Sequence, residues 1–235
     1  MNRERNRVAE TPYGKIIANN HDLYISRSII NGGYYEIDGI KSLVALIEET
    51  RRFENPQILD IGANIGTHAL AYSEIRGAEV HSFEAQRAVF YMLAGTLALN
   101  GIDNVWVHHR AVSDRTGEWI EFDRPNYDSA INIGGFELLP PHHSDGGTLK
   151  ATDEKERVQT MRIDDLGLDR VSYAKIDIEG MEAECLEGMR ETIKRCRPVL
   201  VIECFKADPA RIFKILTELG YGWETRGIDL WCRPS

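Results

Sequence analysis

The chain lacks the sequence features that mark membrane, secreted and disulfide-rich proteins. No apolar run approaches the roughly 20 residues of a membrane-spanning helix, and residues 1–10 are polar and charged, unlike a signal peptide. The four cysteines form no CxxC pair, so a disulfide framework and the ligand spacing of a zinc site are both missing. We therefore expect a cytoplasmic protein that does not bind membranes and keeps its thiols reduced.

A basic excess, an internal repeat and a low-complexity tract are also missing. With 28 Lys and Arg against 37 Asp and Glu, the formal net charge is -9, which argues against a nucleic-acid partner because phosphate binding requires a dominant basic patch. What is present is an ordinary globular composition, with 43% hydrophobic and 28% charged residues. A length of 235 residues predicts one α/β core with a small appendage.

From residue 56 onward, short apolar runs alternate with runs of helical spacing. This alternation predicts a Rossmann-like, mostly parallel sheet that is covered on both faces and binds ligands beyond the carboxyl ends of its strands. Two final runs flank Arg226-Gly227, which we interpret as a hairpin turn, so the sheet should end in an antiparallel pair. The expected strands are 57–61, 79–83, 105–109, 173–178, 199–204, 221–225 and 228–232, and the expected helices are 67–74, 88–99, a segment through 185–193, and 209–219 after an Asp208 N-cap.

Two regions fall outside this alternation. Residues 1–54 are expected to form an N-terminal extension, with a short hairpin around 19–22 and a helix that buries Ile40, Leu43, Val44 and Ile47. The domain that binds the ligand should then span 55–235. Within it, residues 124–157 show little periodicity, and an unpatterned segment of this length is typical of a functional loop, so we interpret it as an insert and a candidate substrate lid.

The strongest motif is DIGANIG at 60–66, where an expected strand gives way to a helix. Gly62 and Gly66 permit a sharp turn and close approach of the backbone to a ligand, and Asp60 can hold the turn. A dinucleotide fingerprint would place a third glycine at Asn64, where the backbone approaches a pyrophosphate. The motif therefore favours an adenosyl ligand, with an ordinary tight turn as the alternative.

A second acidic residue follows at the expected distance. Glu84 ends the next strand about 20 residues after Gly62, where a carboxylate typically accepts hydrogen bonds from ribose hydroxyls. The alternative is a solvated carboxylate at a strand end. Ala111 and Val112, just past the third strand, lie where the edge of an adenine is expected.

Asp177 and Glu179 close the fourth main strand at the ligand side of the sheet. Period-two alternation puts both on one face, opposite Ile176 and Ile178. Carboxylates there can orient an acceptor hydroxyl, take its proton or complement a sulfonium charge. The alternative for Glu179 is that it only interacts favourably with the dipole of the following helix. Two carboxylates alone are weak evidence for a divalent metal, so no metal ligand is predicted.

In these motifs and their order the chain resembles the FkbM family of S-adenosylmethionine-dependent methyltransferases. The resemblance covers most of residues 55–205 and departs from the family at Ala85-Gln86, where a proline commonly follows the glutamate. The residues that carry it are 60–66, 83–84, 97–100, 111–114, 160–166, 175–180 and 197–198.

The resemblance implies a class I methyltransferase fold with a seven-stranded sheet, S-adenosylmethionine as cofactor, and methyl transfer to a hydroxyl of a sugar or small natural product. Asp177 and Glu179 are the expected catalytic residues. The residues expected to bind the cofactor are Glu36, Asp60, Gly62, Asn64, Gly66, Glu84, Ala85, Ala111, Val112 and Asp177.

Other functions stay open at this point. A nicotinamide-dependent oxidoreductase and a noncatalytic adenosyl-binding module are the competing hypotheses, and a homodimer is one possible oligomeric state. Tyr34 is a candidate for covering the cofactor beside Glu36. His68 is expected to be a scaffold residue, and His142-His143 belong either to a solvated loop or to a general base.

Overall fold

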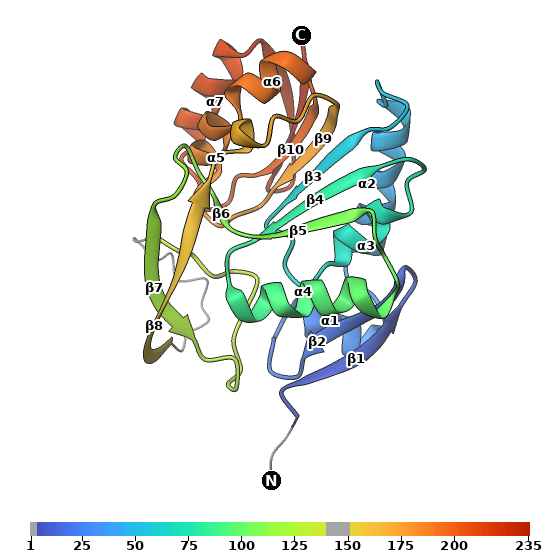
Figure 1. The fold of residues 1–235 in the computed structure, drawn as a ribbon, viewed down its shortest axis with the longest axis vertical. Coiled ribbons are helices and arrows are strands. Elements are labelled where there is room, and N and C mark those ends of the chain that lie inside the picture. The colour runs from blue at the N-terminus through green and yellow to red at the C-terminus, as the bar shows by residue number, and fades with distance from the viewer. Residues whose placement is uncertain (1–3, 140–150) are drawn as a thin grey trace.

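The computed structural model describes residues 4–139 and 151–235, and its centre is a seven-stranded sheet (Figure 1). Strand β12 runs antiparallel to both of its neighbours, and the remaining pairs are parallel, as the sequence predicts. In spatial order the strands are β11 (Tyr221–Arg226), β12 (Asp229–Pro234), β10 (Val199–Glu203), β9 (Val171–Ile176), β3 (Gln57–Ile61), β4 (Glu79–Glu84) and β5 (Val105–His109).

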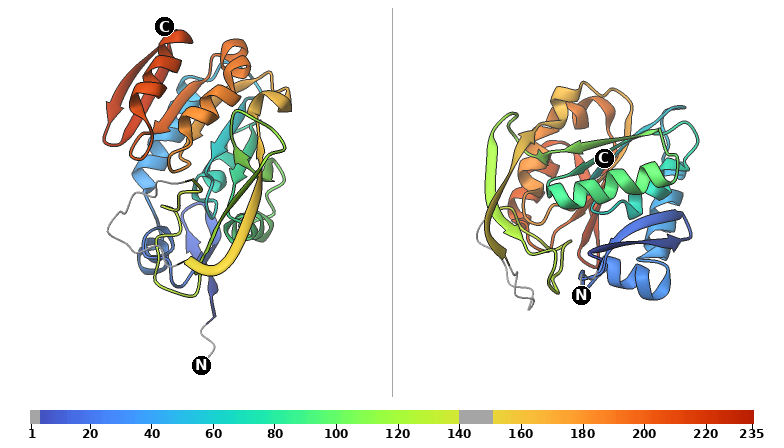
Figure 2. Two further views of the ribbon diagram at one scale, coloured as in Figure 1. Left: turned by 90° about the vertical axis from the view of Figure 1, so that its left-hand side faces the viewer. Right: turned by 60° about the horizontal axis from the view of Figure 1, so that its bottom comes forward.

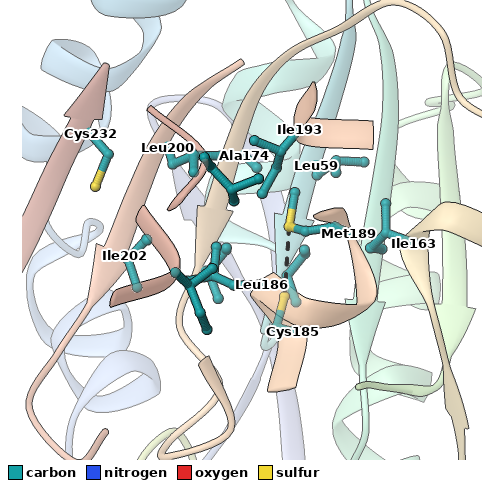
Figure 3. Close-up of a cluster of buried hydrophobic side chains, with 14 of the residues drawn as sticks. Leu59, Ile163, Ala174, Cys185, Leu186, Met189, Ile193, Leu200, Ile202 and Cys232 are labelled. Atoms are coloured by element: carbon teal, nitrogen blue, oxygen red, sulfur yellow. Dashed lines mark hydrogen bonds between the residues drawn. The ribbon is translucent and has the colours of Figure 1, made fainter. Parts of the chain in front are cut away.

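Helices cover both faces of this sheet. On one face, α5 (Glu182–Gly188), α6 (Arg190–Cys196) and α7 (Pro209–Glu218) bury an apolar cluster against β3, β9 and β10 (Figure 3). On the other face, α2 (Ile37–Glu49) and α3 (Thr67–Ser73) pack over Ile58, Val80 and Tyr173, and α4 (Arg87–Leu99) lies beside β5. Apolar burial on both faces explains why the central strands are near-continuous apolar runs.

The N-terminal extension differs from the prediction in its hairpin. The hairpin consists of β1 (Asn6–Thr11) and β2 (Gly14–Asn19), so its turn precedes the predicted position at 19–22. It lies under α4 (Figure 1), where the Ile17 backbone N–H donates to Thr96 Oγ1 over 3.0 Å. A further helix, α1 (Ile25–Gly32), follows, and α2 buries Ile40, Leu43 and Ile47 as predicted.

The segment 124–157 is more regular at its ends than its sequence suggests. Strand β7 (Trp119–Pro125) pairs antiparallel with β8 (Ala151–Met161), which also pairs with the short β6 (Ala111–Val112). The β7–β8 ribbon extends beside the main sheet (Figure 2), and a 3-10 turn, η1 (Ile163–Leu166), leads from β8 to β9. Periodicity failed in β8 because its inward face carries the polar residues Glu156 and Thr160 beside Val158, and most of its other residues are exposed.

Three boundaries also differ from the prediction. Strand β9 ends at Ile176, so Asp177 and Glu179 lie in the following loop, and strand alternation does not place them. The apolar stripe through 185–193 is divided between α5 and α6, and the hairpin between β11 and β12 turns at Gly227-Ile228, one residue later than predicted. The N-cap at Asp208 is confirmed, because its carboxylate accepts the Ala210 N–H over 3.0 Å.

None of the helices in the described part of the chain has the length and apolar character needed to span a membrane.

Candidate active site

A cavity of about 450 Å³ opens beyond the carboxyl ends of β3, β4, β9 and β10. Its volume lies within the range of small-molecule sites, and its position is the one expected for a ligand of a parallel sheet. Of the predicted site residues, the cavity is lined by Glu36, Gly62, Asn64, Glu84, Ala85, Ala111, Val112, Asp177 and Glu179. Asp60 and Gly66 are close in sequence to this lining but do not belong to it.

Gly62 begins the glycine turn and lies directly against the loop after β9. Its φ of 87° is in the left-handed region, and a Cβ there would lie 1.7 Å from the Asp177 carbonyl oxygen. The Asp177 N–H in turn donates to the Ile61 carbonyl over 3.0 Å. The structural requirement for glycine is therefore the contact between these two loops, which brings Asp177 to the predicted ligand turn.

Glu84 holds the other side of the glycine turn. Its Oε2 accepts the Asn64 N–H over 3.0 Å, and its Oε1 accepts the Gln86 N–H over 2.8 Å. Burial raises the pKa of Glu84 to about 7, against the opposing effect of these N–H groups. A carboxylate oxygen can accept more than one hydrogen bond, and Glu84 lines the cavity, so it can serve as the predicted acceptor of ribose hydrogen bonds in addition to its structural role.

Asp60 lies beneath the cavity on β3, fully buried. Neither carboxyl oxygen has a hydrogen-bond partner among the described residues, and burial raises the pKa of this carboxyl to about 6 despite Lys175 on the neighbouring strand. An unpaired buried carboxyl is costly, which makes Asp60 a suitable partner for polar groups of a ligand or its waters.

The Asp177 carboxylate is held in place by a neighbouring lysine. Lys175 Nζ lies 2.6 Å from its Oδ2. Burial opposes ionisation, yet the Lys175 ammonium and a hydrogen bond from Glu203 hold the pKa of Asp177 below its ordinary value. Glu203, at the end of β10, has its pKa raised to about 9 by burial and by the neighbouring Asp177 and Glu179 carboxylates, so it keeps its proton at neutral pH.

Glu179 has a left-handed backbone, with a φ of 56°, in a loop whose Ile178 and Gly180 N–H groups donate to Glu182. Its carboxylate lies 2.9 Å from Lys206 Nζ. Burial raises the pKa of Glu179 to about 7 even though Lys206 lowers it. This carboxyl is therefore poised to gain or lose a proton near neutral pH.

Three carboxyl groups gather at this end of the cavity. Asp177, Glu179 and Glu203 each have one oxygen within 4.8 Å of the other two, an arrangement that a divalent cation can occupy. Lys175 and Lys206 already neutralise two of them, so we assign no metal.

The segment 126–139 crosses the cavity and is held on both sides of it. Gln86 Nε2 donates to the Ile133 carbonyl over 3.0 Å, and Lys206 Nζ donates to the Gly135 carbonyl over 2.8 Å. Its residues Asn132, Gly134, Gly135, Phe136 and Leu138 line the cavity. Residues 140–150 of the predicted lid, which include His142 and His143, lie outside the described residues.

Backbone strain is concentrated here. Among the described residues, four non-glycine residues have a positive φ, and three of them, Glu36, Asn64 and Glu179, line the cavity. Such strain persists where surrounding structure enforces it, often at functional sites. Glu36 lies beside Tyr35, which lines the cavity, whereas the predicted Tyr34 is outside the lining and 52% exposed.

The sequence analysis gave no role in the site to several residues that the structure places there. Glu203 ends β10, as Glu84 ends β4, so the same positional argument could have found it. Lys175 belongs to the 175–180 motif but was given no role there, and Lys206 lies outside every motif, because their roles arise from contacts with Asp177 and Glu179. His68 lines the cavity in addition to lying in α3, and burial lowers its pKa to about 3, so it is neutral at physiological pH.

Comparison with known proteins gives consistent results. The 2-O-methyltransferase NoeI of Sinorhizobium fredii is 27% identical over 165 residues, which cover 67% of this chain and 65% of NoeI. The hexuronic acid methyltransferase AglP of Haloferax volcanii is 26% identical over 189 residues, covering 78% of this chain and 70% of AglP. This chain thus spans less than two thirds of NoeI.

A solved structure and a family model complete the comparison. The methyltransferase FkbM of Methylobacillus flagellatus has a TM-score of 0.50 and 23% identity, covering 77% of this chain and 44% of that chain, which supports the fold alone. The model of the methyltransferase FkbM domain matches residues 60–222, a range that includes the glycine turn, Glu84 and the Asp177 loop. The chain therefore belongs to the FkbM methyltransferase domain family, and this membership indicates S-adenosylmethionine as its cofactor.

Proposed function

We propose that the chain is an S-adenosylmethionine-dependent O-methyltransferase that acts on a hydroxyl of a sugar or small natural product. The observation that carries the proposal is the Asp177 carboxylate, which Lys175 fixes beside the glycine turn. Family membership favours methyl transfer over a nicotinamide-dependent reaction, and the names of NoeI and AglP support oxygen as the methylated atom.

When bound, S-adenosylmethionine supplies an electrophilic methyl group next to a positive sulfonium. Asp177 has the charge and position to complement that sulfonium and to accept a hydrogen bond from the acceptor hydroxyl. Its lowered pKa makes it a weak base, whereas Glu179, with a pKa of about 7, is better matched to proton removal at neutral pH.

The spacing of these groups allows one hydroxyl to contact both. Hydrogen-bond reach is roughly 2.6 to 3.2 Å, so an oxygen between two carboxylate oxygens that are up to 4.8 Å apart can contact each. Asp177 would then orient the hydroxyl, and Glu179 would receive its proton as the oxygen takes the methyl group from the bound cofactor. Most of the acceleration comes from this positioning.

Calorimetry with S-adenosylmethionine and NAD, followed by an assay for S-adenosylhomocysteine with glycoside acceptors, tests the proposal. We expect binding of the first ligand only, and acceptor-dependent product formation. Tight binding of NAD would favour the oxidoreductase, and cofactor binding with no turnover on any hydroxyl acceptor would favour a noncatalytic module.

A further inference from the structure

The acceptor end of the cavity has an acidic wall, formed by Glu36, Asp177, Glu179, Glu203 and Asp229. The elements bring these residues together from separate parts of the chain. Glu203 and Asp229 are paired across β10 and β12, and Glu36 precedes α2. Burial raises the pKa of Asp229, Lys175 opposes this shift, and the charges of Asp177 and Glu36 add to it, so the carboxyl groups are close enough to repel one another.

The cations near this wall are already engaged. Lys175 contacts Asp177, and its side chain is 13% exposed. Lys206 contacts Glu179 and Glu137, and its side chain is 2% exposed. Both amino groups therefore face carboxylates rather than the open cavity.

Glu36 and Asp229 differ from Asp177 and Glu179, because neither forms an ion pair with a lysine or arginine among the described residues, although Tyr35 hydrogen-bonds to Glu36. Glu203 forms no such ion pair either, but it hydrogen-bonds to Asp177. Glu36 is exposed and Asp229 half-buried, so both carboxylates are accessible to a ligand in the cavity. Tyr35 and Trp231 also line the cavity, and the Arg226 guanidinium covers one face of the Trp231 ring, 4.2 Å from its centroid, which leaves only the other face for a ligand.

This combination of accessible carboxylates and aromatic rings is suited to an ammonium group. A cation gains from the carboxylates by charge-assisted hydrogen bonds and from the electron-rich ring faces. A carboxylate on the acceptor would meet like charge instead, in a partly desolvated cavity where repulsion is weakly screened.

We propose that the acceptor carries a protonated amine, as an amino sugar does, and that Glu36 and Asp229 bind it. This inference rests on the proposed methyltransferase function and adds the charge of the acceptor. It separates this chain from a hexuronic acid methyltransferase such as AglP, whose named substrate carries a carboxylate.

The test measures binding of three methyl glycosides to the protein loaded with S-adenosylhomocysteine, by calorimetry. The glycosides are those of glucosamine, N-acetylglucosamine and glucuronic acid, which present an ammonium, a neutral amide and a carboxylate. We expect the glucosaminide to bind at least about tenfold more tightly than the neutral amide, and the glucuronide most weakly, with the preference shrinking as salt is added.

Asp229→Asn and Glu36→Gln should each reduce the preference for the ammonium several-fold, and Asp229→Asn should leave binding of S-adenosylhomocysteine unchanged. Asp103→Asn, at an exposed carboxylate outside the cavity lining, is the matched control and should leave the preference unchanged. Equal binding of the three glycosides, absence of binding by all three, tighter binding of the glucuronide, or an unchanged preference in both cavity variants would overturn the inference. Failure to bind S-adenosylhomocysteine would instead count against the proposed function.

Discussion

Lys175 Nζ and Asp177 Oδ2 lie 2.6 Å apart, two residues from each other in sequence and at the point where β9 gives way to the loop of the active site. The pair joins the interior of the sheet to the cavity, since Lys175 also faces the buried Asp60 on β3. Removing either member therefore affects stability as well as chemistry, and an informative mutation must separate the two effects.

The double variant Lys175→Met/Asp177→Asn makes that separation. Asp177→Asn alone should lower turnover by at least ~10² and destabilise the fold by roughly 3 kcal/mol, because it leaves a buried ammonium without its partner. Adding Lys175→Met should restore most of the stability but not the turnover, as measured by urea denaturation and by S-adenosylhomocysteine production. Full turnover in folded Asp177→Asn would exclude its catalytic role.

Glu84→Gln should weaken binding of S-adenosylmethionine more than tenfold. The variant keeps one oxygen for the glycine turn, sets its amide NH2 against the other backbone N–H, and loses a charge-assisted acceptor for ribose, worth on the order of 1.5 to 3 kcal/mol. Calorimetry provides the measurement. Glu79→Gln, at the opposite end of the same strand, is the control and should bind normally. Equal affinities of Glu84→Gln and wild type would leave Glu84 with only its structural role.

The titration of Glu203 should lower the free energy of unfolding as the pH rises. Its pKa is about 9 in the fold against an ordinary 4.5, so between these values the native state holds a proton that the unfolded state has released. Stability from this group is complete below pH 4.5 and is lost as the pH rises through 9, at up to about 1.4 kcal/mol per pH unit.

Glu203→Gln mimics the protonated acid and should flatten this part of the pH profile. We expect it to match wild type in urea denaturation near pH 5 and to be more stable than wild type at pH 8. The groups that face Glu203 are Asp177, Glu179, Lys175 and Glu182, and they remain in the variant. Identical slopes for the two proteins would show that Glu203 is ionised in the native state at neutral pH.

Gly62→Ala should be strongly destabilising, by at least about 2 kcal/mol, because it combines a left-handed φ with a clash against the Asp177 backbone. Gly117→Ala is the matched control. Its φ of 88° is nearly the same, but a Cβ there meets nothing within 4 Å, so only about 1 kcal/mol of backbone strain is expected. Comparable midpoints in urea for the two variants would contradict the proposed contact.

Phe136→Ala tests whether the segment 126–139 recognises the acceptor. Phe136 lines the cavity and packs against Phe122 in an apolar cluster that also contains Ala85 and Ala111, so its truncation enlarges the cavity without touching the glycine turn. We expect KM for the acceptor to rise several-fold and calorimetric affinity for S-adenosylhomocysteine to fall less, because the glycine turn and Glu84 are unchanged. An unchanged acceptor preference would place recognition elsewhere in the cavity.

The sequence predicted most of the fold because its central strands and helices have strong local periodicity, and the glycine turn and Glu84 follow from positions at strand ends. The N-terminal hairpin was misplaced because β1 is an exposed, polar strand with no alternation. Asp177 and Glu179 line the cavity, but the strand alternation used to place them was wrong, since both follow the end of β9 and Glu179 has a left-handed backbone. Lys206 could not be predicted, because its contacts with Glu179 and Gly135 are between segments far apart in sequence.

Lys206 also connects the chemistry of the site to the chain that crosses it. The same ammonium contacts the Glu179 carboxylate and the Gly135 carbonyl. The protonation state of Glu179 is therefore coupled to the position of the segment 126–139. Thermodynamic reciprocity then requires that lifting the segment change the proton affinity of Glu179, and that protonating Glu179 change the tendency of the segment to lift, by the same free energy.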